Sequence, residues 1–385
     1  MKTKIISAGT AFAWFFWVSS TVGLSLNVNS KSSICAAAYQ IVDGELDYYE
    51  GIRYGGTVGM FTWPYYWWHA GEVFGGWVDY WAFCAKNNDT FSGILFDAMY
   101  SQRGANNNYM PQNQTVTEGN DDQGVWGMTL MQAVERNFTN PKQHTWLYLT
   151  QSLFNTMNSR WNTTTCNGGL KWQIFTYLNG FYYKNTISNG SLFQLAARLY
   201  RFTGNKYYLD VAEKVWTWAL GIGLINTEKN TWEIYDGATE STNCTELTKW
   251  KWSYTYGIFM SGSAYLYNAT GDPKWRDATL HFVNASSYFF NNTVMTEMTC
   301  ATVDKCNEDE SAKAAARSCS GDETNTCGFN WSEDGWDGVW GLGEQMSALE
   351  TIMSLITYKQ VPLTPKTGAQ NRGGNVKAGI NTSAG

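Results

Sequence analysis

Two stretches of the chain decide its fold: residues 198–216 read RLYRFTGNKYYLDVAEKVW and residues 264–283 read AYLYNATGDPKWRDATLHFV. In each, one helical pattern ends on a glycine and the next begins on Asn or Asp. Gly204 and Gly271 suit the left-handed position after a helix, and the residue that follows each can cap the next helix. Recurrent helical hairpins of this kind predict a closed ring.

Helical periodicity continues outward from these hairpins in both directions. The clearest segment is 206–220, whose apolar face consists of Tyr208, Ala212, Val215, Trp216 and Ala219. A weaker copy of the hairpin turn, without the glycine, occupies 81–93. No series of alternating strands stands out, so the pattern predicts an all-α fold with helices over 36–50, 66–85, 90–103, 121–138, 144–159, 188–203, 206–220, 252–268, 273–290, 309–318 and 341–357.

The N-terminal residues 1–24 have the layout of a signal peptide. Lys2 and Lys4 precede an apolar run over 11–18, and small residues follow it. That run is too short to span a bilayer. We therefore expect a secreted protein.

The mature chain is expected to form one domain over 25–358, followed by a disordered Pro/Gly/Asn-rich tail over 359–385. The small residues of the tail resemble the cleavage side of a GPI-anchor signal, of which the tail would be a remnant. Because the hydrophobic stretch that completes such a signal is absent, the sequence leaves anchoring open.

Cysteines and glycosylation motifs agree with secretion. The eight cysteines form an even set that would enter an oxidising compartment, which predicts disulfides, although their pairing cannot be read from the sequence. Asn-x-Ser/Thr motifs begin at eleven asparagines, which indicates a glycoprotein. These are Asn88, Asn113, Asn137, Asn162, Asn189, Asn243, Asn268, Asn284, Asn291, Asn330 and Asn381.

Composition narrows the class of partner. The formal net charge is −6 and no basic stripe is present, which argues against nucleic acid or an anionic membrane surface. Aromatic residues make up 16% of the chain, with 20 Trp and 23 Tyr. Such rings can lie against the C–H faces of sugars, but a Trp-rich core explains any one of them equally well.

Two adjacent acids, Asp121 and Asp122, follow Gly119 at the start of a predicted helix. A single Asp there is explained by capping and by the helix dipole. Two side by side repel each other and raise one pKa, so that one carboxyl can stay protonated while the other is ionised, as a glycosidase requires. Neighbouring helical positions can hold carboxyls roughly 5–6 Å apart, closer to the retaining than to the inverting spacing.

The segment EGNDDQ at 118–123, followed by Trp126, resembles the signature of family 76 glycoside hydrolases, the α-1,6-mannanase family. Further blocks resemble its fungal branch, so the resemblance covers nearly the whole mature chain. They are PYYWWHAGEVFGGWVDYWAF (64–83), NNYMPQNQT (107–115), GGLKWQIF (168–175), YYKNTISNG (182–190), IYDGATESTNC (234–244) and CGFNWSEDGWDGVWGLGEQMSALE (327–350).

The resemblance implies an (α/α)6 barrel in which Asp121 is the nucleophile and Asp122 the general acid/base. Residues in the matched blocks become candidate sugar contacts, each with a structural role as an equal alternative: Trp67, Trp68, Tyr109, Trp172, Gln173, Asn189 and Asp236, with Asp337 as a weaker one. Asn189 also begins a glycosylation motif, and we expect it to be unmodified, because a glycan there would block a cleft.

No cofactor or metal is predicted. His69 lies among Trp67, Trp68 and Glu72, but the chain has only three histidines, and none are at i, i+4 spacing. A core or supporting role for His69 is the better interpretation.

By resemblance, the function is that of a mannan endo-1,6-α-mannosidase-type hydrolase or transglycosylase in fungal cell-wall biogenesis. The donor would be α-mannan or the GPI-core glycan, the acceptor β-glucan, and the protein a monomer in the cell wall or at the outer face of the plasma membrane. Two alternatives stay open: a non-catalytic mannan-binding wall protein, and a hydrolase of another polysaccharide.

The chain departs from the family after Cys306. Fungal members carry a further helix there, whereas here CNEDE runs directly into SAKAAARSC. Eleven predicted helices, where six hairpins need twelve, agree with a ring that lacks one helix near residue 306.

Overall fold

The computed structural model describes residues 23–114, 116–228, 231–291 and 336–357, with short stretches between 294 and 328. Nearly all of the predicted signal peptide and the whole predicted tail at 359–385 lie outside these residues. The predicted helix at 309–318 and the missing helix near 306 also fall largely outside them.

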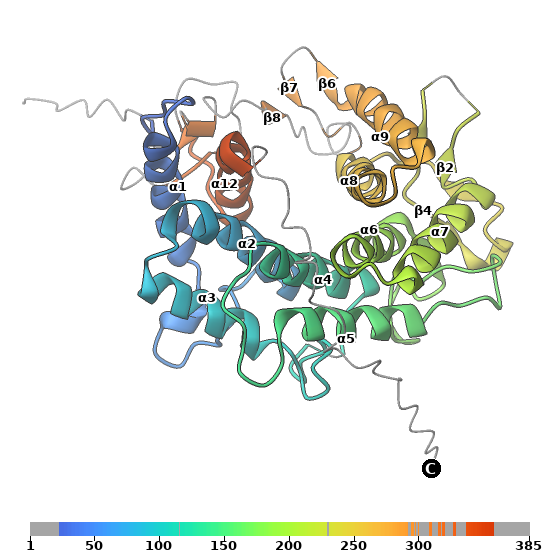
Figure 1. Ribbon diagram of the computed structural model, residues 1–385, viewed down its shortest axis with the longest axis horizontal. Coiled ribbons are helices and arrows are strands. Elements are labelled where there is room, and N and C mark those ends of the chain that lie inside the picture. Colours follow the sequence, from blue (N-terminus) through green and yellow to red (C-terminus); the bar gives the residue numbers. More distant parts are fainter. Residues whose placement is uncertain are drawn as a thin grey trace, which may run out of the picture.

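The described helices form two layers around a common centre (Figure 1). The inner helices are α2 (Trp67–Tyr80), α4 (Asn120–Glu135), α6 (Thr186–Thr203), α8 (Ser253–Thr270) and α12 (Leu342–Thr357). The outer helices are α1 (Lys31–Leu46), α3 (Asp89–Ser101), α5 (Trp146–Ser159), α7 (Lys206–Gly221) and α9 (Pro273–Ser286). Successive inner helices are neighbours, and α12 packs against α1 and α2. This is the arrangement expected of a ring of hairpins.

The hairpin turns form as predicted. Gly204 and Gly271 both end their helices at φ 68°. Asn205 accepts a hydrogen bond from the N–H of Tyr207, and Asp272 accepts one from Lys274. Asn88, in the weaker third copy, caps α3 in the same way through the N–H of Phe91. Side-chain caps of this kind stabilise a helix by about 1 kcal/mol each.

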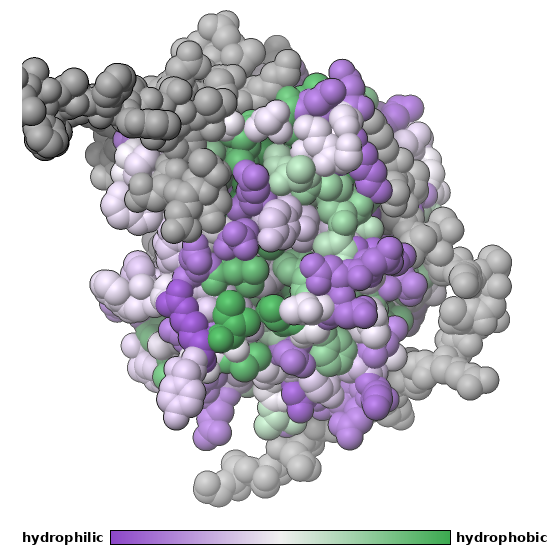
Figure 2. Space-filling view, turned by 90° about the vertical axis from the view of Figure 1, so that its left-hand side faces the viewer, coloured by the Kyte–Doolittle hydropathy of each residue, from purple (hydrophilic) through white to green (hydrophobic). Residues whose placement is uncertain are grey.

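Aromatic packing joins the first three helices. Trp77 of α2 is fully buried and meets the rings of Tyr49, Phe74 and Phe91 at centroid distances of 5.8, 5.3 and 5.5 Å. Such pairs add about 0.5–1.5 kcal/mol beyond burial. On the outside of this half of the molecule, hydrophobic side chains form patches bordered by hydrophilic ones (Figure 2).

The prediction of helices alone missed three small antiparallel sheets. The largest places β1 (Tyr183–Asn185) beside β4 (Gly237–Thr239) and β4 beside β5 (Leu247–Thr248). The others pair β2 (Ile225–Asn226) with β3 (Glu233–Ile234), and β6 (Phe290–Asn291) with β7 (Val294–Met295) and β8 (Glu308–Asp309). Strands of two or three residues are too short for alternation to reveal them.

Two of the three disulfides within the described residues connect segments that are distant in sequence. Cys35 of α1 pairs with Cys84 in the π-helical turn after α2, and Cys166 pairs with Cys244 beyond β4. Cys319 pairs with Cys327. Cys300 and Cys306 lie outside the described residues. Within the described part of the chain, no helix is long and apolar enough to cross a membrane.

A cavity of about 520 Å³ lies between α2, α4, α6 and α12, and two acids, Glu72 and Glu350, line it. Glu350 is exposed at the cavity, and its carboxyl lies so close to Gly76 of α2 that a Cβ there would be 3.0 Å from Oε1. Burial raises the pKa of Glu72 to about 7, and burial followed by repulsion from Asp79 and Glu72 raises that of Glu350 to about 7. Both acids are therefore protonated when the protein is folded in mildly acidic solution.

The folded protein should lose stability as the pH rises from about 4.5 to about 7. An acid whose pKa is higher in the folded state stabilises the fold below its unfolded pKa, and that contribution disappears as the pH rises through the folded value. The urea midpoint of the wild type should be lower at pH 8 than at pH 5. The midpoint of Glu350→Gln should decrease less, because the amide has the shape of the protonated acid and does not ionise. The exposed Glu228→Gln variant is the control. Equal losses in wild type and Glu350→Gln would contradict the assignment.

Candidate active site

The candidate site is built on the start of α4. Gly119 precedes the helix in an extended conformation, and a Cβ there would collide with Asp121 Oδ1 and lie 3.2 Å from the carbonyl oxygen of Trp172. The N–H of Asn120 donates to that same carbonyl at 2.8 Å, and Gly119 bridges to Gln173. The segment at 171–173 therefore fixes where the helix begins.

Asp121 and Asp122 occupy the first turn, at the positive end of the helix dipole. Asp121 accepts hydrogen bonds from the N–H of Asp122 at 3.1 Å, from Asn185 Nδ2 at 3.4 Å and from the side chain of Trp172. Asp122 accepts from the N–H of Gly119 at 2.6 Å. Three donors thus favour the ionised form of Asp121, against one for Asp122.

The two carboxyls keep some open surface but are largely enclosed by protein. Burial, followed by repulsion from Asp122, raises the pKa of Asp121 to about 7. Burial also raises the pKa of Asp122, partly offset by the bond from Gly119. Because the two groups interact strongly, these values belong to the pair. Burial and repulsion raise the pKa of Asp121, whereas its hydrogen-bond donors favour its ionised form. At mildly acidic pH the pair holds one proton.

Glu118 is a third acid at this site, and sequence reasoning gave it no role although it lies in EGNDDQ. Its side chain is buried, and neither carboxyl oxygen has a hydrogen-bond partner. Burial and repulsion from Asp122 raise the pKa of Glu118 to about 8, against the opposing charge of Arg160. Glu118 is therefore neutral at the pH at which the aspartate pair holds one proton.

Arg160, immediately after α5, was also missed. Its Nε donates to Asn120 Oδ1 at 2.7 Å, and Nη2 donates to Gln123 Oε1. No signal in the sequence connects residue 160 with 120–123, because the contact depends on how α5 folds back against α4.

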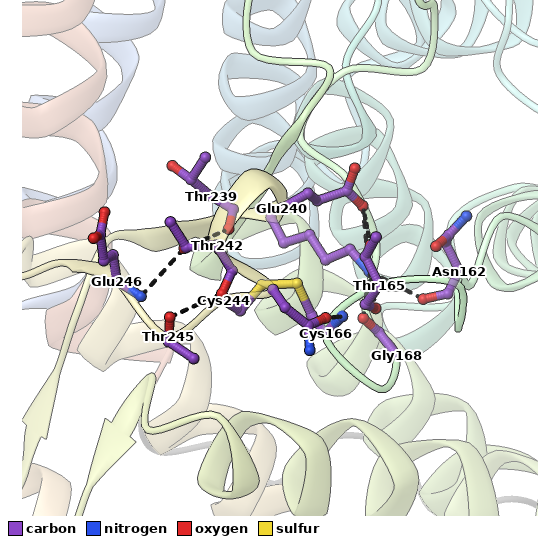
Figure 3. Close-up of a disulfide and its surroundings, with 12 residues drawn as sticks. Asn162, Thr165, Cys166, Gly168, Thr239, Glu240, Thr242, Cys244, Thr245 and Glu246 are labelled. Carbon is purple, nitrogen blue, oxygen red and sulfur yellow. Dashed lines mark hydrogen bonds and ion pairs between the residues drawn. A yellow bond between two sulfur atoms is a disulfide. The ribbon is translucent and has the colours of Figure 1, made fainter.

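A buried lysine holds the loop that reaches the site. Lys184 Nζ donates to the carbonyl oxygens of Asn162, Thr165 and Gly168 at 3.0, 2.9 and 2.6 Å, and it lies 3.5 Å from Glu240. Figure 3 shows this loop beside the disulfide of Cys166, with Thr165 and Glu240 in contact. The lysine and the disulfide together fix the loop that leads into 171–173.

Asp236 lies on the side of the site formed by β1 and β4. Its carboxylate accepts a hydrogen bond from the Tyr183 hydroxyl, and its backbone oxygen accepts from the N–H of Thr186 at 2.7 Å. Tyr254 keeps open surface, yet partial desolvation, followed by the charges of Asp236, Glu297 and Asp121, raises the pKa of its hydroxyl. The hydroxyl of Tyr254 therefore lies within reach of the charges of Asp236 and Asp121.

The structure places three of the predicted sugar contacts in the interior: Trp67, Tyr109 and Asn189. Trp67 Nε1 donates to Gln102, and its ring stacks on Trp126 at 5.1 Å. The Tyr109 hydroxyl donates to Met99 O at 2.8 Å. The amide of Asn189 is bonded to Leu170 and Asn185. These side chains support the site from inside.

The other predicted contacts keep open surface. Trp172 is 37% exposed beside Asp121, and Trp68, Gln173 and Asp236 are half-buried. The weaker candidate Asp337 accepts a hydrogen bond from the N–H of Val339 in a turn.

His69 supports the start of α2. Its Nδ1 accepts from the N–H of Tyr66 at 3.0 Å, and the ring of Trp68 stacks on it at 3.7 Å. Burial lowers the pKa of His69. No cluster of three potential metal ligands occurs within the described residues.

Known proteins resemble this chain over most of its length. The mannan endo-1,6-α-mannosidase DFG5 of Candida albicans is 51% identical, over 92% of this chain and 86% of its own. The crystal structure of Dfg5 from Chaetomium thermophilum in complex with glucosamine has a TM-score of 0.80 and 33% identity, and the match covers 89% of this chain and 95% of that one.

A bacterial structure shares the fold at lower identity. It is an inactive variant of the α-1,6-mannanase GH76A of Salegentibacter with two neighbouring aspartates replaced by asparagine, in complex with α-1,6-mannotriose. Its TM-score is 0.64 at 16% identity, over 84% of this chain and 98% of that one.

The sequence pattern of glycosyl hydrolase family 76 matches residues 33–312 and 309–366, two segments that overlap at 309–312. Together with the ring of helical hairpins and the aspartate pair at the start of α4, this match shows that the chain belongs to glycosyl hydrolase family 76, with its (α/α)6 barrel fold.

Proposed function

We propose that this chain cleaves or transfers α-1,6-linked mannose with retention of configuration, using Asp121 as the nucleophile and Asp122 as the general acid/base. The observation that carries the proposal is the pair itself: two adjacent, largely enclosed carboxyls that share one proton at the start of α4. The names of the similar proteins supply the linkage and the sugar.

The hydrogen bonds support this order of roles. Three donors stabilise a negative charge on Asp121, as a nucleophile requires, whereas Asp122, with one donor, is better suited to carry the proton. An oxygen of Asp121 attacks the anomeric carbon while Asp122 gives its proton to the leaving oxygen. The glycosidic C–O bond breaks as the ester to Asp121 forms.

In the second step, Asp122 is a carboxylate and takes a proton from water or from a sugar hydroxyl. The oxygen of that acceptor displaces Asp121 from the anomeric carbon. Water gives hydrolysis and a sugar gives transfer. The donor would be α-mannan or a GPI-core glycan and the acceptor β-glucan. Three disulfides within the described residues and the similarity to the fungal mannosidases support an extracellular site of action at the cell wall.

Replacing either aspartate should abolish turnover. Asp121→Asn removes the nucleophile and Asp122→Asn the proton donor, and general acid catalysis alone is typically worth about 10²–10⁴-fold. The assay uses the purified protein with α-1,6-mannan oligosaccharides or a GPI-core glycan, with and without β-glucan oligosaccharides. Asp89→Asn, which changes an exposed aspartate at the start of α3, is the matched control and should keep wild-type activity.

Wild type and Asp121→Asn with the same turnover would refute the proposed chemistry. Saturable binding of mannan without product in the wild type, unchanged in Asp122→Asn, would instead favour a non-catalytic wall protein. Turnover of a different polysaccharide alone would show that the linkage was assigned wrongly.

Azide should separate the two roles. With a mannobioside that carries a good leaving group, Asp122→Gly still forms the glycosyl ester, and azide then displaces Asp121 to give the α-mannosyl azide. In Asp121→Gly, azide attacks the anomeric carbon directly and gives the β-azide. Proton NMR of the products identifies the anomer. The reverse pattern would exchange the roles of Asp121 and Asp122.

Activity should fall as the pH rises through about 7. The pKa near 7 is raised from its ordinary value, so the shared proton persists to that pH and is lost above it, which removes the general acid. Glu118→Gln should keep most of the activity at pH 6, because Gln resembles a neutral Glu118, and the alkaline limb should not move to higher pH. Profiles of kcat/KM against pH measure both. Inactivity of a folded Glu118→Gln at pH 6 would show that Glu118 works as a carboxylate.

A further inference from the structure

Arg160 is a largely buried cation that binds neutral groups. Its guanidinium donates to the amide oxygens of Asn120 and Gln123, and Nη1 lies 3.8 Å from the sulfur of Met110. None of the ion pairs in the described part of the chain includes Arg160. A buried guanidinium normally pairs with a carboxylate, so its use on two amides points to a geometric purpose. The C-terminal end of α5 partly compensates the charge.

The two amides stand at either side of the catalytic pair. Asn120 begins the first turn of α4 and Gln123 ends it, with Asp121 and Asp122 between them. Each amide is held at both ends: Asn120 Nδ2 donates to Lys171 O at 2.9 Å, and Gln123 Nε2 donates to Asn108 O at 2.7 Å. Neither amide can turn over without losing hydrogen bonds at both atoms.

We propose that Arg160 is a positioning residue for the catalytic pair. Its planar guanidinium binds the side chains of residues 120 and 123 at the same time and so holds the two aspartates between them in place. The inference rests on the proposed function of Asp121 and Asp122. Arginine suits this task because its donors form a rigid planar fork, whereas lysine offers a single point of attachment. A shift of about 1 Å in the reacting groups can cost about 100-fold in rate.

The charge of Arg160 acts on Glu118, which is not a member of the aspartate pair. It lowers the pKa of Glu118, while burial is the largest influence on the pKa of both aspartates and repulsion from Asp122 adds to that of Asp121. Lysine at position 160 would keep this charge but could not bracket two amides. The two effects can therefore be separated by experiment.

The test compares Arg160→Lys with Arg160→Met in the full-length protein, with α-1,6-mannan oligosaccharides as substrate. Both variants should lower kcat by about 10–100-fold with little change in KM, because the substrate still binds while the pair is misplaced. The alkaline limb of the pH profile of Arg160→Lys should stay where the wild type has it. If lysine at position 160 restored kcat, or if the alkaline limb of the pH profile shifted with the charge at this position, the proposed positioning role of Arg160 would be refuted.

Arg136 provides the matched control at the other end of α4. It pairs with Asp79 of α2 at 2.5 Å and is comparably enclosed. Arg136→Met should lower the melting temperature and leave the kcat of the folded protein unchanged. If Arg136→Met and Arg160→Met have the same effect on kcat, Arg160 stabilises the helix and does not position the pair.

Gln123→Leu tests the same proposal by removing one of the two amides, and it leaves the charge of Arg160 unchanged. It should lower kcat less than Arg160→Met, and the double variant should lose less than the sum of the two. Additive effects would overturn the proposal. A crystal structure of Arg160→Met should show the carboxyls of Asp121 and Asp122 displaced, and an undisturbed first turn would overturn the proposal even if the wild type did not turn over mannan. Failure of the proposed function is recognised separately, by equal turnover of wild type and Asp121→Asn.

Discussion

The first N–H of α4 donates to the carbonyl oxygen of Trp172, and most of the geometry around the aspartate pair depends on this bond. It sets the residue at which the helix begins, and therefore which side chains occupy its first turn. The same short segment supplies the side chain of Trp172 to Asp121 and the carbonyl of Lys171 to Asn120. A shift of one residue in either segment of this contact would move the carboxyl of Asp121 away from Asn185.

Buried groups on the inner side of this contact hold it in place. Lys184 is fully buried, and its three carbonyl acceptors together with Glu240 fix the loop that runs into Trp172. A buried lysine costs free energy unless its ammonium is fully bonded, and here it is. The disulfide between Cys166 and Cys244 restrains the same loop covalently. The site is thus rigid although it lies at the end of the helices, where chains are usually mobile.

Much of the scaffold and part of the site could be predicted from the sequence, for reasons that differ from residue to residue. Gly204 and Gly271 signal a helix end because few other residues accept a positive φ. Asp121 and Asp122 stand out because adjacent acids at one helix start are poorly explained by capping alone. Trp67, Tyr109 and Asn189 could not be placed, because residue type and a matched block do not say whether a side chain faces a cleft or the core.

Arg160 was invisible for a different reason. Its partners are 37 and 40 residues away in sequence. Nothing local distinguishes it from an arginine at any helix end. Glu118 lies within the recognised segment, but its burial without hydrogen bonds is a property of the packed structure. Contacts between segments, and the loss of water they cause, decide the chemistry of both groups.

The contacts of the aspartate pair lie in a part of the chain that precedes residues 309–312, where the two matches to family 76 overlap. Among the described residues, the groups that hydrogen-bond to the aspartate pair come from the segments at 118–123 and 171–185. The groups behind them are Arg160, after α5, and Glu240, after β4. The overlap of the two matches follows α9 in the chain, and β6, β7 and β8 lie between α12 and α8 in Figure 1. Among the described residues, none of the hydrogen bonds of Asp121, Asp122 and Arg160 involves a residue beyond β4.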